Sequence, residues 1–453
     1  MTASARSTLA LVASMLALSA LPALRLVSVS AQQPVAPGVP AVTFTRDVAP
    51  ILQQRCQVCH QPESIAPMSL LTYDDAKKYA ARIKSKINAR LMPPWYIDKT
   101  IGIQHFKNDR SLTDAEIATI TRWVDAGTPL GDPKDLPAAA APAPTTAWQF
   151  VKTFGQPDLV LTSPPYTLAA RTQDKWFRPV SETGLTEPRW GRAIEIRPKT
   201  LEGRKIVHHV LTTLEQHETG VTNLADSAHD MQMTAGLFME WAVGKTGELY
   251  AADAGKLMLP GSKIHWEIHM YAIGQEVRNN QIELAVYFYP KGEVPKRRTV
   301  LKMFDVSRGS ELDIAPNSTA MTQNFYVMQA PARLENFQPH MHMRGKAMSM
   351  EAIYPDGRRE MLSIVNNFQW RWHVNYIYAD DAAPLLPKGT MLVFTAWHDN
   401  TSANPNNPDP RQWVGWGDRT VDEMAHAWVD VTYLEPAEYE QLVAARKTQA
   451  AKK

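Results

Sequence analysis

Apolar positions recur at helical spacing in the first part of the chain, between residues 43 and 133. The stretch YDDAKKYAARIKSKINARL (73–91) has aspartates near its start and basic residues toward its end, which matches the polarity of the helix dipole. The stretch SLTDAEIATITRWVDAG (111–127) begins with a Thr–Asp capping signal and ends at a glycine. Residues 43–133 therefore predict a small all-α domain.

The pattern changes near residue 148, where short runs of β-favouring residues alternate between apolar and polar positions. KIHWEIHMYAI (263–273) and TMLVFTAW (390–397) are examples, and Pro, Gly, Asn and Asp separate such runs, as is typical of strands. We expect two all-β sandwich domains, at 148–305 and 306–435, with their junction in a turn-rich region.

Two segments outside these domains differ in composition. Residues 134–147 are rich in Ala and Pro and cannot pack a core, so we interpret them as a linker. Helical spacing returns only in the C-terminal tail, residues 436–453.

The N-terminus has the pattern of a secretory signal peptide. A basic residue precedes the apolar run at 7–24, and small residues ending at Ala31 offer a cleavage site. Pro22 interrupts the run and Arg25 follows it, which argues against an uncleaved anchor. We expect residues 1–31 to be removed. No later stretch is long and apolar enough to span a bilayer, so we expect a soluble periplasmic or secreted product without a membrane span.

Charge and cysteine content narrow the function classes. The formal net charge is +2 and the Lys and Arg residues are scattered, so nothing predicts a nucleic-acid partner. The chain has only two cysteines, Cys56 and Cys59, and both belong to one short motif. The β region must therefore be stable by burial without disulfides.

The motif CQVCH (56–60) places two thiols three positions apart, followed directly by His60. This spacing allows two thioether bonds to one haem, with His60 as an axial ligand of the iron. A zinc site would need a second cysteine pair, and a redox dithiol would need a βαβ context. We therefore predict one covalent haem c.

The sixth haem ligand is open among three residues. Met92 lies 32 residues after His60 in the sequence, and the two prolines that follow it stiffen the chain. Met68 lies only 8 residues after His60, and His105 is the third candidate. We favour Met92 because Pro93 and Pro94 stiffen the chain beside it, and Met–His ligation would then favour electron transfer.

Histidines of the β region form three further groups. His208 and His209 are adjacent, so on a regular strand they point to opposite faces and share a metal only where the backbone is irregular or different ring nitrogens bind. His265, Glu267 and His269 fall on one strand face, which could bind a metal or be solvated.

His340 and His342 leave the same face of a strand, as a chelate requires. Imidazole suits copper, zinc or iron, so this pair does not name its metal. The other interpretation is two solvated histidines.

Four motifs in this order resemble the copper type II, ascorbate-dependent monooxygenases, the relatives of peptidylglycine α-hydroxylating monooxygenase and dopamine β-monooxygenase. The resemblance covers about residues 155–435. Its motifs are HHV (208–210), IHWEIHMYAIG (264–274), PHMHMRGK (339–346) and WGDRTVDEM (416–424). The N-terminal part separately resembles cytochrome c domains that are fused to such modules in exported bacterial proteins.

The resemblance implies two jelly-roll sandwiches that each hold one copper. It assigns His208, His209 and His269 to an electron-transfer copper. It assigns His340, His342 and Met424 to an oxygen-binding copper, where a thioether favours Cu(I). His398 lies in another stretch that resembles bacterial members of this family. The resemblance gives it no role beyond a place in a loop or a contact with a metal ligand.

The sequence departs from the peptide-hydroxylating members at three positions. Gln338 stands where they carry an arginine that anchors a substrate carboxylate, and His426 and Trp428 stand where they carry an asparagine and a tyrosine. A peptide with a C-terminal glycine is therefore not the expected substrate. The family's disulfides are also absent.

The implied function is an exported monooxygenase that contains haem and copper and hydroxylates an activated C–H bond of a small molecule with O2. Electrons would come from ascorbate or a periplasmic or respiratory redox partner, through the haem and the first copper. The alternatives are a non-enzymatic electron carrier or copper-binding protein, and a haem sensor with inert β domains.

Overall fold

The computed structural model describes residues 41–138, 148–218, 236–245, 247–307 and 311–450. The predicted signal peptide, and the predicted linker from residue 139 onward, lie outside these residues.

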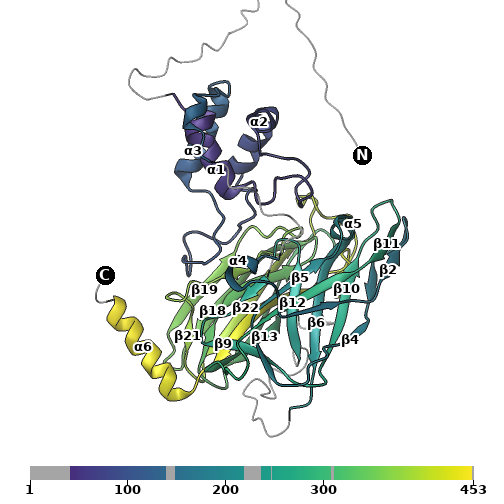
Figure 1. Cartoon of the computed structure of the whole chain (residues 1–453), viewed down its shortest axis with the longest axis vertical. Coiled ribbons are helices and arrows are strands. Elements are labelled where there is room, and N and C mark those ends of the chain that lie inside the picture. The colour runs from purple at the N-terminus through teal and green to yellow at the C-terminus, as the bar shows by residue number, and fades with distance from the viewer. Residues whose placement is uncertain (1–40, 139–147, 219–235, 246, 308–310, 451–453) are drawn as a thin grey trace, which may run out of the picture. The chain divides into compact units, whose positions relative to one another are not determined.

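Strands dominate the structure, with 37% of residues in strands and 18% in helices. The longest described helix, α2 (Tyr73–Asn88), has 16 residues. The predicted fold class, a small all-α cytochrome c domain followed by two all-β jelly-roll sandwich domains, is therefore wrong. The fold is mostly β-sandwich, and its short helices do not form a separate all-α domain (Figure 1).

Local sequence signals still define two of the N-terminal helices. Thr72 and Asp75 form a capping box at the start of α2, and Thr113 and Glu116 form another at the start of α3 (Asp114–Asp125). The other N-terminal helices are η1 (Phe44–Val48), α1 (Ala49–Arg55) and η2 (Pro133–Asp135).

The segment between α2 and α3 explains why the all-α prediction fails. Trp95 and Phe106 lie in the same apolar core as the strands of the C-terminal half. The ring centroids of Trp95 and Tyr376 are 4.8 Å apart, and those of Phe106 and Tyr378 are 5.6 Å apart. The helical periodicity on either side of this segment carries no information about a connection that packs on distant strands.

The largest sheet has eleven strands in the order β1-β12-β5-β9-β13-β24-β16-β21, with β8, β17 and β20 paired beside this path. Its strands are β1 (Leu159–Thr162), β5 (Arg189–Pro198), β8 (Gly247–Leu249), β9 (Ala254–Met258), β12 (Ile282–Phe288), β13 (Arg297–Asp305), β16 (Ala332–Leu334), β17 (Asn336–Met341), β20 (Tyr376–Ile377), β21 (Leu385–Leu386) and β24 (Ala425–Tyr433).

Two smaller sheets cover this large sheet, one in each half of the β region. The five-stranded sheet consists of β3 (Lys175–Phe177), β4 (Val180–Glu182), β6 (Val207–Glu215), β7 (Leu237–Ala242) and β10 (Lys263–Met270). The four-stranded sheet consists of β15 (Thr319–Val327), β18 (Gly345–Ile353), β19 (Arg359–Val365) and β22 (Met391–Asp399). The remaining elements are the strand pairs β2 (Tyr166–Leu168) with β11 (Val277–Asn280) and β14 (Asp313–Ile314) with β23 (Val414–Gly415), and the helices α4 (Val151–Phe154), α5 (Leu201–Ile206) and α6 (Pro436–Ala450).

The two halves of the β region, the first half (148–305) and the second half (306–435), have separate cores but share the large sheet. Val210, Trp266 and Leu284 belong to the core of the first half, whereas Phe337 and Phe394 belong to that of the second. Strand β13 pairs antiparallel with β24 and parallel with β9, so backbone hydrogen bonds run from one half into the other.

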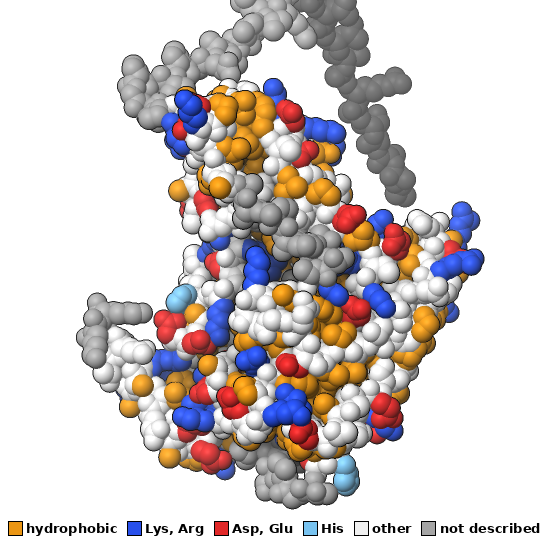
Figure 2. Space-filling model, in the orientation of Figure 1, with side chains coloured by type: hydrophobic (Ala, Val, Ile, Leu, Met, Phe, Trp, Pro, Cys, Tyr) orange, Lys and Arg blue, Asp and Glu red, His pale blue; other side chains and the backbone are white. Residues whose placement is uncertain are grey.

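On the face in Figure 2, lysine and arginine side chains are interspersed with aspartate and glutamate, in keeping with the net charge of +2. Among the described residues, no helix has the length and apolar character needed to cross a membrane.

Candidate metal centre

A β-bulge brings three histidines together in the first half. Strand β6 pairs with β10 so that His209 lies opposite His269, but the next pair joins Val207 to Met270. His208 is therefore the extra residue of a bulge, which re-aims its side chain. This is the irregular backbone that two adjacent histidines need in order to face one ion.

The ring nitrogens of these three histidines converge. The Nδ1 atoms of His208 and His209 are 3.2 Å apart, and those of His209 and His269 are 3.3 Å apart. Imidazole nitrogens about 2.0–2.1 Å from a shared zinc-like ion would be spaced about 3.3–3.6 Å from one another. The spacing of His208, His209 and His269 therefore fits a metal ion.

The surroundings of His269 set its tautomer. Its Nε2 lies 3.3 Å from a carboxylate oxygen of Asp174, which also accepts a hydrogen bond from the Thr420 hydroxyl at 3.1 Å. Because the carboxylate accepts, Nε2 carries the proton and Nδ1 presents its lone pair to the other histidines. The hydrogen bond from His269 lowers the pKa of Asp174, and Trp176 stacks on the His269 ring at 4.3 Å.

Burial keeps His208 and His209 neutral, which metal binding requires. It lowers the pKa of His208 to about 3 and that of His209 well below the usual value. Among the described residues, these two and His269 are the group of three whose ligand atoms lie within 4.8 Å of one another.

The second histidine group lies where β17 meets β24. His340 pairs in register with His426, and their rings stack at 4.5 Å. His340 and His342 have ring centroids 5.3 Å apart and are 1% and 2% exposed, so they are not a solvated pair. The His342 Nδ1 donates to the Asp422 carbonyl at 3.1 Å, which leaves Nε2 free to bind a metal.

Met424 comes directly before β24, whose first residue, Ala425, pairs with Met341. His342 and Met424 therefore directly adjoin the last residue pair of these two strands. His398, which is fully buried, lies with its Nε2 3.5 Å from the Met424 carbonyl oxygen and 3.8 Å from Glu423. His398 thus contacts the backbone of Met424, the residue predicted to supply the third ligand of this group.

His373, a histidine that the sequence analysis did not single out, also contacts this region. His373 lies with its Nδ1 2.6 Å from the Nδ1 of His340, and its ring is 5.5 Å from that of His208. The rings of His209 and His340 are 5.8 Å apart, so the two groups are neighbours. His373 is an isolated histidine in WRWHV and Asp174 an isolated aspartate, so no spacing pattern marks either residue.

The remaining polar face of β10 is not part of the centre. His265 forms an exposed pair with Glu215 at 2.5 Å, and Glu267 pairs with Arg178 at 2.7 Å. Only His269 on this face turns into the buried cluster.

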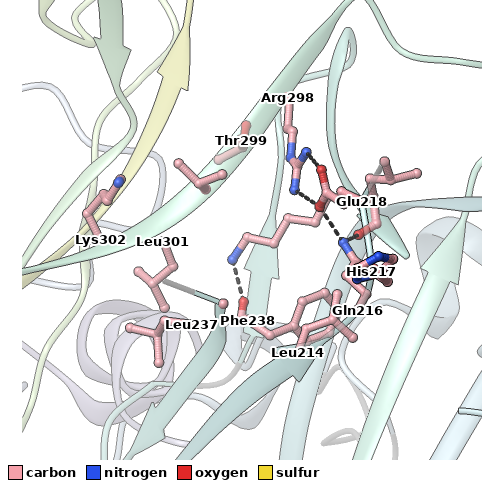
Figure 3. A pocket seen from close by; sticks show the side chains of 14 residues that line it. Leu214, Gln216, His217, Glu218, Leu237, Phe238, Arg298, Thr299, Leu301 and Lys302 are labelled. Atoms are coloured by element: carbon pink, nitrogen blue, oxygen red, sulfur yellow. Dashed lines mark hydrogen bonds and ion pairs between the residues drawn. The ribbon is translucent and has the colours of Figure 1, made fainter. Parts of the chain in front are cut away.

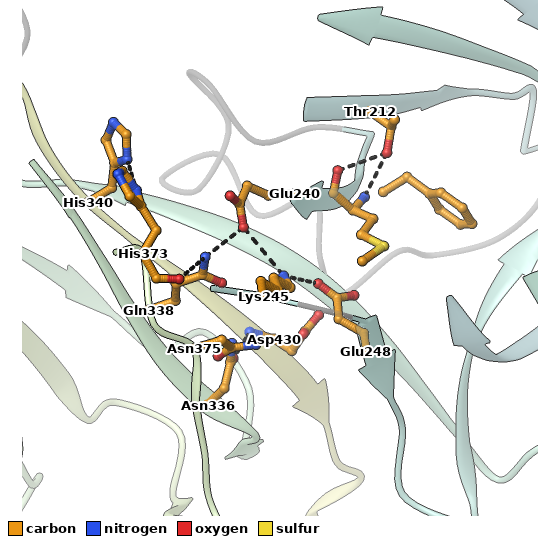
Figure 4. Close-up of polar contacts among 12 residues, drawn as sticks. Thr212, Glu240, Lys245, Glu248, Asn336, Gln338, His340, His373, Asn375 and Asp430 are labelled. Atoms are coloured by element: carbon orange, nitrogen blue, oxygen red, sulfur yellow. Dashed lines mark hydrogen bonds and ion pairs between the residues drawn. The ribbon is translucent and has the colours of Figure 1, made fainter. Parts of the chain in front are cut away.

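Gln338 belongs to a buried polar network rather than to a binding surface (Figure 4). Its side-chain amide donates to Glu240 at 2.7 Å and to the His373 carbonyl at 3.4 Å. The network continues from Glu240 to Lys245 and from Lys245 to Glu248. Gln338 is 0% exposed, so it does not offer its side chain to a substrate.

The CQVCH motif, predicted to attach a haem, lies in the turn that follows α1, with the backbone N–H groups of Cys59 and His60 donating to the Cys56 carbonyl. Both cysteines are free. The His60 Nδ1 donates to the Met68 carbonyl at 3.2 Å, which leaves Nε2 as the ligand atom.

The candidates for the sixth haem ligand differ in their surroundings. Met92 is half-buried, whereas His105 is exposed and pairs with Asp381 at 2.9 Å. The Met68 backbone lies on the Nδ1 side of His60, away from the free Nε2.

Two pockets of about 360 and 370 Å³ lie outside the three-histidine cluster. Figure 3 shows the first, where Arg298 pairs with Glu218 at 2.7 Å and Lys256 donates to the Phe238 carbonyl. Its basic groups are thus already engaged. The second pocket is bordered by His398 and Trp397, and through His398 it reaches the Met424 segment.

Comparison with known proteins identifies no relative. No family model and no curated protein matches the sequence. Among solved structures, one of infectious bursal disease virus (Gx strain) aligns over 66% of this chain and 76% of its own, with 10% identity and a TM-score of 0.16. A two-domain protein of unknown function from Bacteroides fragilis aligns over 60% and 94%, with 7% identity and a TM-score of 0.14. Scores this low carry no argument about fold or function.

Proposed function

We propose that the protein is a copper-dependent monooxygenase with two adjacent metal sites. The observation that carries this proposal is the convergence of three ring nitrogens, because the Nδ1 of His209 lies 3.2 Å from that of His208 and 3.3 Å from that of His269. Burial also lowers the pKa of His208 and His209. Three imidazoles suit a metal that changes oxidation state, whereas two imidazoles with a thioether favour Cu(I). The latter donor set is available from His340, His342 and Met424.

Copper bound there would supply the O2 and one-electron chemistry of hydroxylation. In the overall reaction, one oxygen atom enters a C–H bond and the other leaves as water with two electrons and two protons from the donor. The chain's own residues would hold the ligands in place: Asp174 orients His269, the Asp422 carbonyl orients His342, and His398 supports the Met424 backbone.

Residue 338 should not anchor a carboxylate group of the substrate. Gln338 is buried and already donates to Glu240. We therefore infer that a small molecule with an activated C–H bond is the substrate, and not a peptide recognised through its C-terminus. The 370 Å³ pocket lined by His398 is a candidate space for such a molecule, because the His398 Nε2 lies 3.5 Å from the Met424 carbonyl oxygen.

We also propose that Cys56 and Cys59 attach one haem c and that His60 ligates it through Nε2. A haem at this position would supply one-electron transfer between the metal centre and an external donor, either ascorbate or a periplasmic or respiratory partner. Covalent haem attachment agrees with an exported protein. This proposal depends on the CQVCH motif and not on a separate all-α domain.

Metal content and oxygen uptake test the function. Purified full-length protein should bind two coppers, and electron paramagnetic resonance of the oxidised form should report nitrogen ligands. With reductant and candidate substrates, Met424→Ile should abolish oxygen uptake while copper remains bound. Met391→Ile, at a partly exposed methionine at the start of β22 that does not line the 370 Å³ pocket, is the matched control and should keep full uptake.

Burial of His340 and His342 favours one other function, a copper-containing electron carrier without substrate access. In that case oxygen uptake would be absent from the wild type as well as from Met424→Ile, although both would bind copper. Failure of the wild type to bind copper at all would exclude both functions.

A further inference from the structure

One oxygen atom of Asp174 accepts hydrogen bonds from both halves of the β region. From the first half, the His269 Nε2 donates to Oδ2 at 3.3 Å. From the second half, the Thr420 hydroxyl donates to the same Oδ2 at 3.1 Å, and the Thr420 backbone N–H donates to it at 3.4 Å. This carboxylate oxygen therefore joins a member of the three-histidine cluster to a residue that lies 246 positions after Asp174 in the chain.

The sheet alone does not fix the Asp174 carboxylate. Asp174 comes directly before β3, whose first residue, Lys175, already forms the last pair with Met270 of β10. The Asp174 side chain is 25% exposed, so it is not packed tightly on all sides. Such a side chain has several staggered rotamers, and only some of them bring Oδ2 to the His269 Nε2. A second contact is needed to select the rotamer that accepts from His269.

The loop that carries Thr420 is itself held in place. The Arg344 guanidinium donates to the Val421 carbonyl at 2.9 Å. The Glu423 carboxylate accepts the backbone N–H groups of His342 and Arg344. Arg344 and Glu423 are both buried. Because these buried contacts follow Thr420 directly in the chain, the loop presents the Thr420 hydroxyl at a defined place.

We propose that Thr420 is a positioning residue of the first metal site and that it acts through Asp174. The hydroxyl holds Oδ2 where it accepts from the His269 Nε2, which leaves the Nδ1 lone pair of His269 for the ion. The second half of the β region thus completes a site whose three histidines all come from the first half. The inference rests on the proposed function, because it requires a metal ion at His208, His209 and His269.

The test uses full-length protein and Cu(I) in competition with a chromophoric chelator, and the binding event that His208→Gln removes identifies the first site. Thr420→Val keeps the shape of the side chain but removes the hydroxyl. We expect it to raise the dissociation constant of the first site by about 2- to 10-fold, the range that one hydrogen bond contributes to an equilibrium. Thr420→Ser keeps the hydroxyl and should retain wild-type affinity.

Thr100→Val is the matched control. The hydroxyl and the backbone N–H of Thr100 both donate to one carboxylate oxygen of Asp98, as those of Thr420 do to Asp174. Asp98 also accepts from Ile101 and Asn366. Thr100→Val should therefore leave the dissociation constant of the first site unchanged.

A double-substitution cycle separates positioning from a contact that only joins the two halves. If Thr420 acts through Asp174, adding Thr420→Val to Asp174→Asn should not raise the dissociation constant further. Wild-type affinity in Thr420→Val would overturn the inference. So would the same fold-change in the presence and in the absence of the Asp174 carboxylate.

The inference and the proposed function fail in different ways. If the wild type binds no copper at the three histidines, the proposed function fails, and metal-free protein with isotopically labelled histidine decides the inference by NMR. The hydrogen bond to Asp174 favours the Nε2–H tautomer of His269, so Thr420→Val should contain more of the Nδ1–H tautomer than the wild type does. Equal tautomer populations would overturn the inference. Should Thr420→Val lose its circular dichroism spectrum, Thr420→Ala replaces it with the same expected results.

Discussion

Gln338 donates a hydrogen bond to Glu240 across the boundary between the two halves of the β region, with 2.7 Å between Nε2 and Oε2. Gln338 belongs to β17, the strand that carries His340, and Glu240 belongs to β7 of the five-stranded sheet. Both side chains are 0% exposed. The residue at this position therefore connects the halves behind the metal centre instead of facing a substrate.

Replacing Gln338 by leucine should lower the free energy of unfolding by about 1–3 kcal/mol, because it leaves the buried Glu240 Oε2 with only the long 3.5 Å contact from Lys245. Denaturant unfolding of the metal-free protein measures this loss. Gln329→Leu removes an exposed side-chain hydrogen bond on the same half and should change stability much less. Equal losses of unfolding free energy in Gln338→Leu and Gln329→Leu would contradict the role of Gln338 in connecting the two halves.

Glu240 should make stability depend on pH. Burial raises its pKa from 4.5 to about 7, so the folded protein binds this proton more tightly than the unfolded chain does. The contribution of the protonated Glu240 carboxyl to the free energy of unfolding is fully present below about pH 4.5. This contribution is lost as the pH rises through about 7. The loss is up to about 3 kcal/mol, since each pKa unit corresponds to about 1.36 kcal/mol.

The measurement compares wild type with Glu240→Gln, in chelator-containing buffer, by denaturant unfolding across this pH window. The amide cannot ionise, so the stability of the variant relative to wild type should increase as the pH rises. Parallel pH profiles of the two proteins would show that Glu240 does not titrate in this range.

Asp174→Asn should weaken copper binding at the first site by about 10- to 100-fold, because the carboxylate that accepts from the His269 Nε2 orients that ligand. Titration with Cu(I) and a competing chelator gives the affinity. Asp418→Asn changes an exposed carboxylate in the same loop as Thr420 and serves as the control. Retention of wild-type affinity in Asp174→Asn would rule out an orienting role.

Met92→Leu should lower the reduction potential of the haem, because loss of a thioether ligand removes the stabilisation of the reduced iron that methionine provides. A spectroelectrochemical titration of the purified protein measures the potential. Met68→Leu is the matched control, since the backbone of Met68 lies on the Nδ1 side of His60. If the reduction potential falls in Met68→Leu but not in Met92→Leu, Met68 is the sixth haem ligand and Met92 is not.

Local signals were enough to predict particular elements. Charge placement and capping residues predicted helices that the structure contains at Tyr73–Asn88 and Asp114–Asp125. Alternation predicted the strands at Lys263–Met270 and Met391–Asp399. Each of these signals lies within the element that it defines.

Arrangements that depend on distant residues were not predictable in this way. Trp95 and Phe106 bury among strands more than two hundred residues later in the chain, and this contact overturned the expected all-α domain. His373 and Asp174 are single residues without a spacing pattern, and only the fold brings them to His340 and His269. By contrast, the adjacency of His208 and His209 already indicated that both could face one ion only with an irregular backbone or through different ring nitrogens, and the structure has a bulge there.

The pairing of β13 with β24 has a consequence for any attempt to divide the protein. Seven consecutive residue pairs, from Thr299–Thr432 to Asp305–His426, join these strands. A fragment ending at residue 305 would expose the unsatisfied backbone of β13 as a new sheet edge, and a fragment starting at residue 306 would do the same with β24. Such edges recruit other chains. Separate expression of the two halves should therefore yield aggregates, whereas their co-expression would allow the missing edge to be filled by its natural complement.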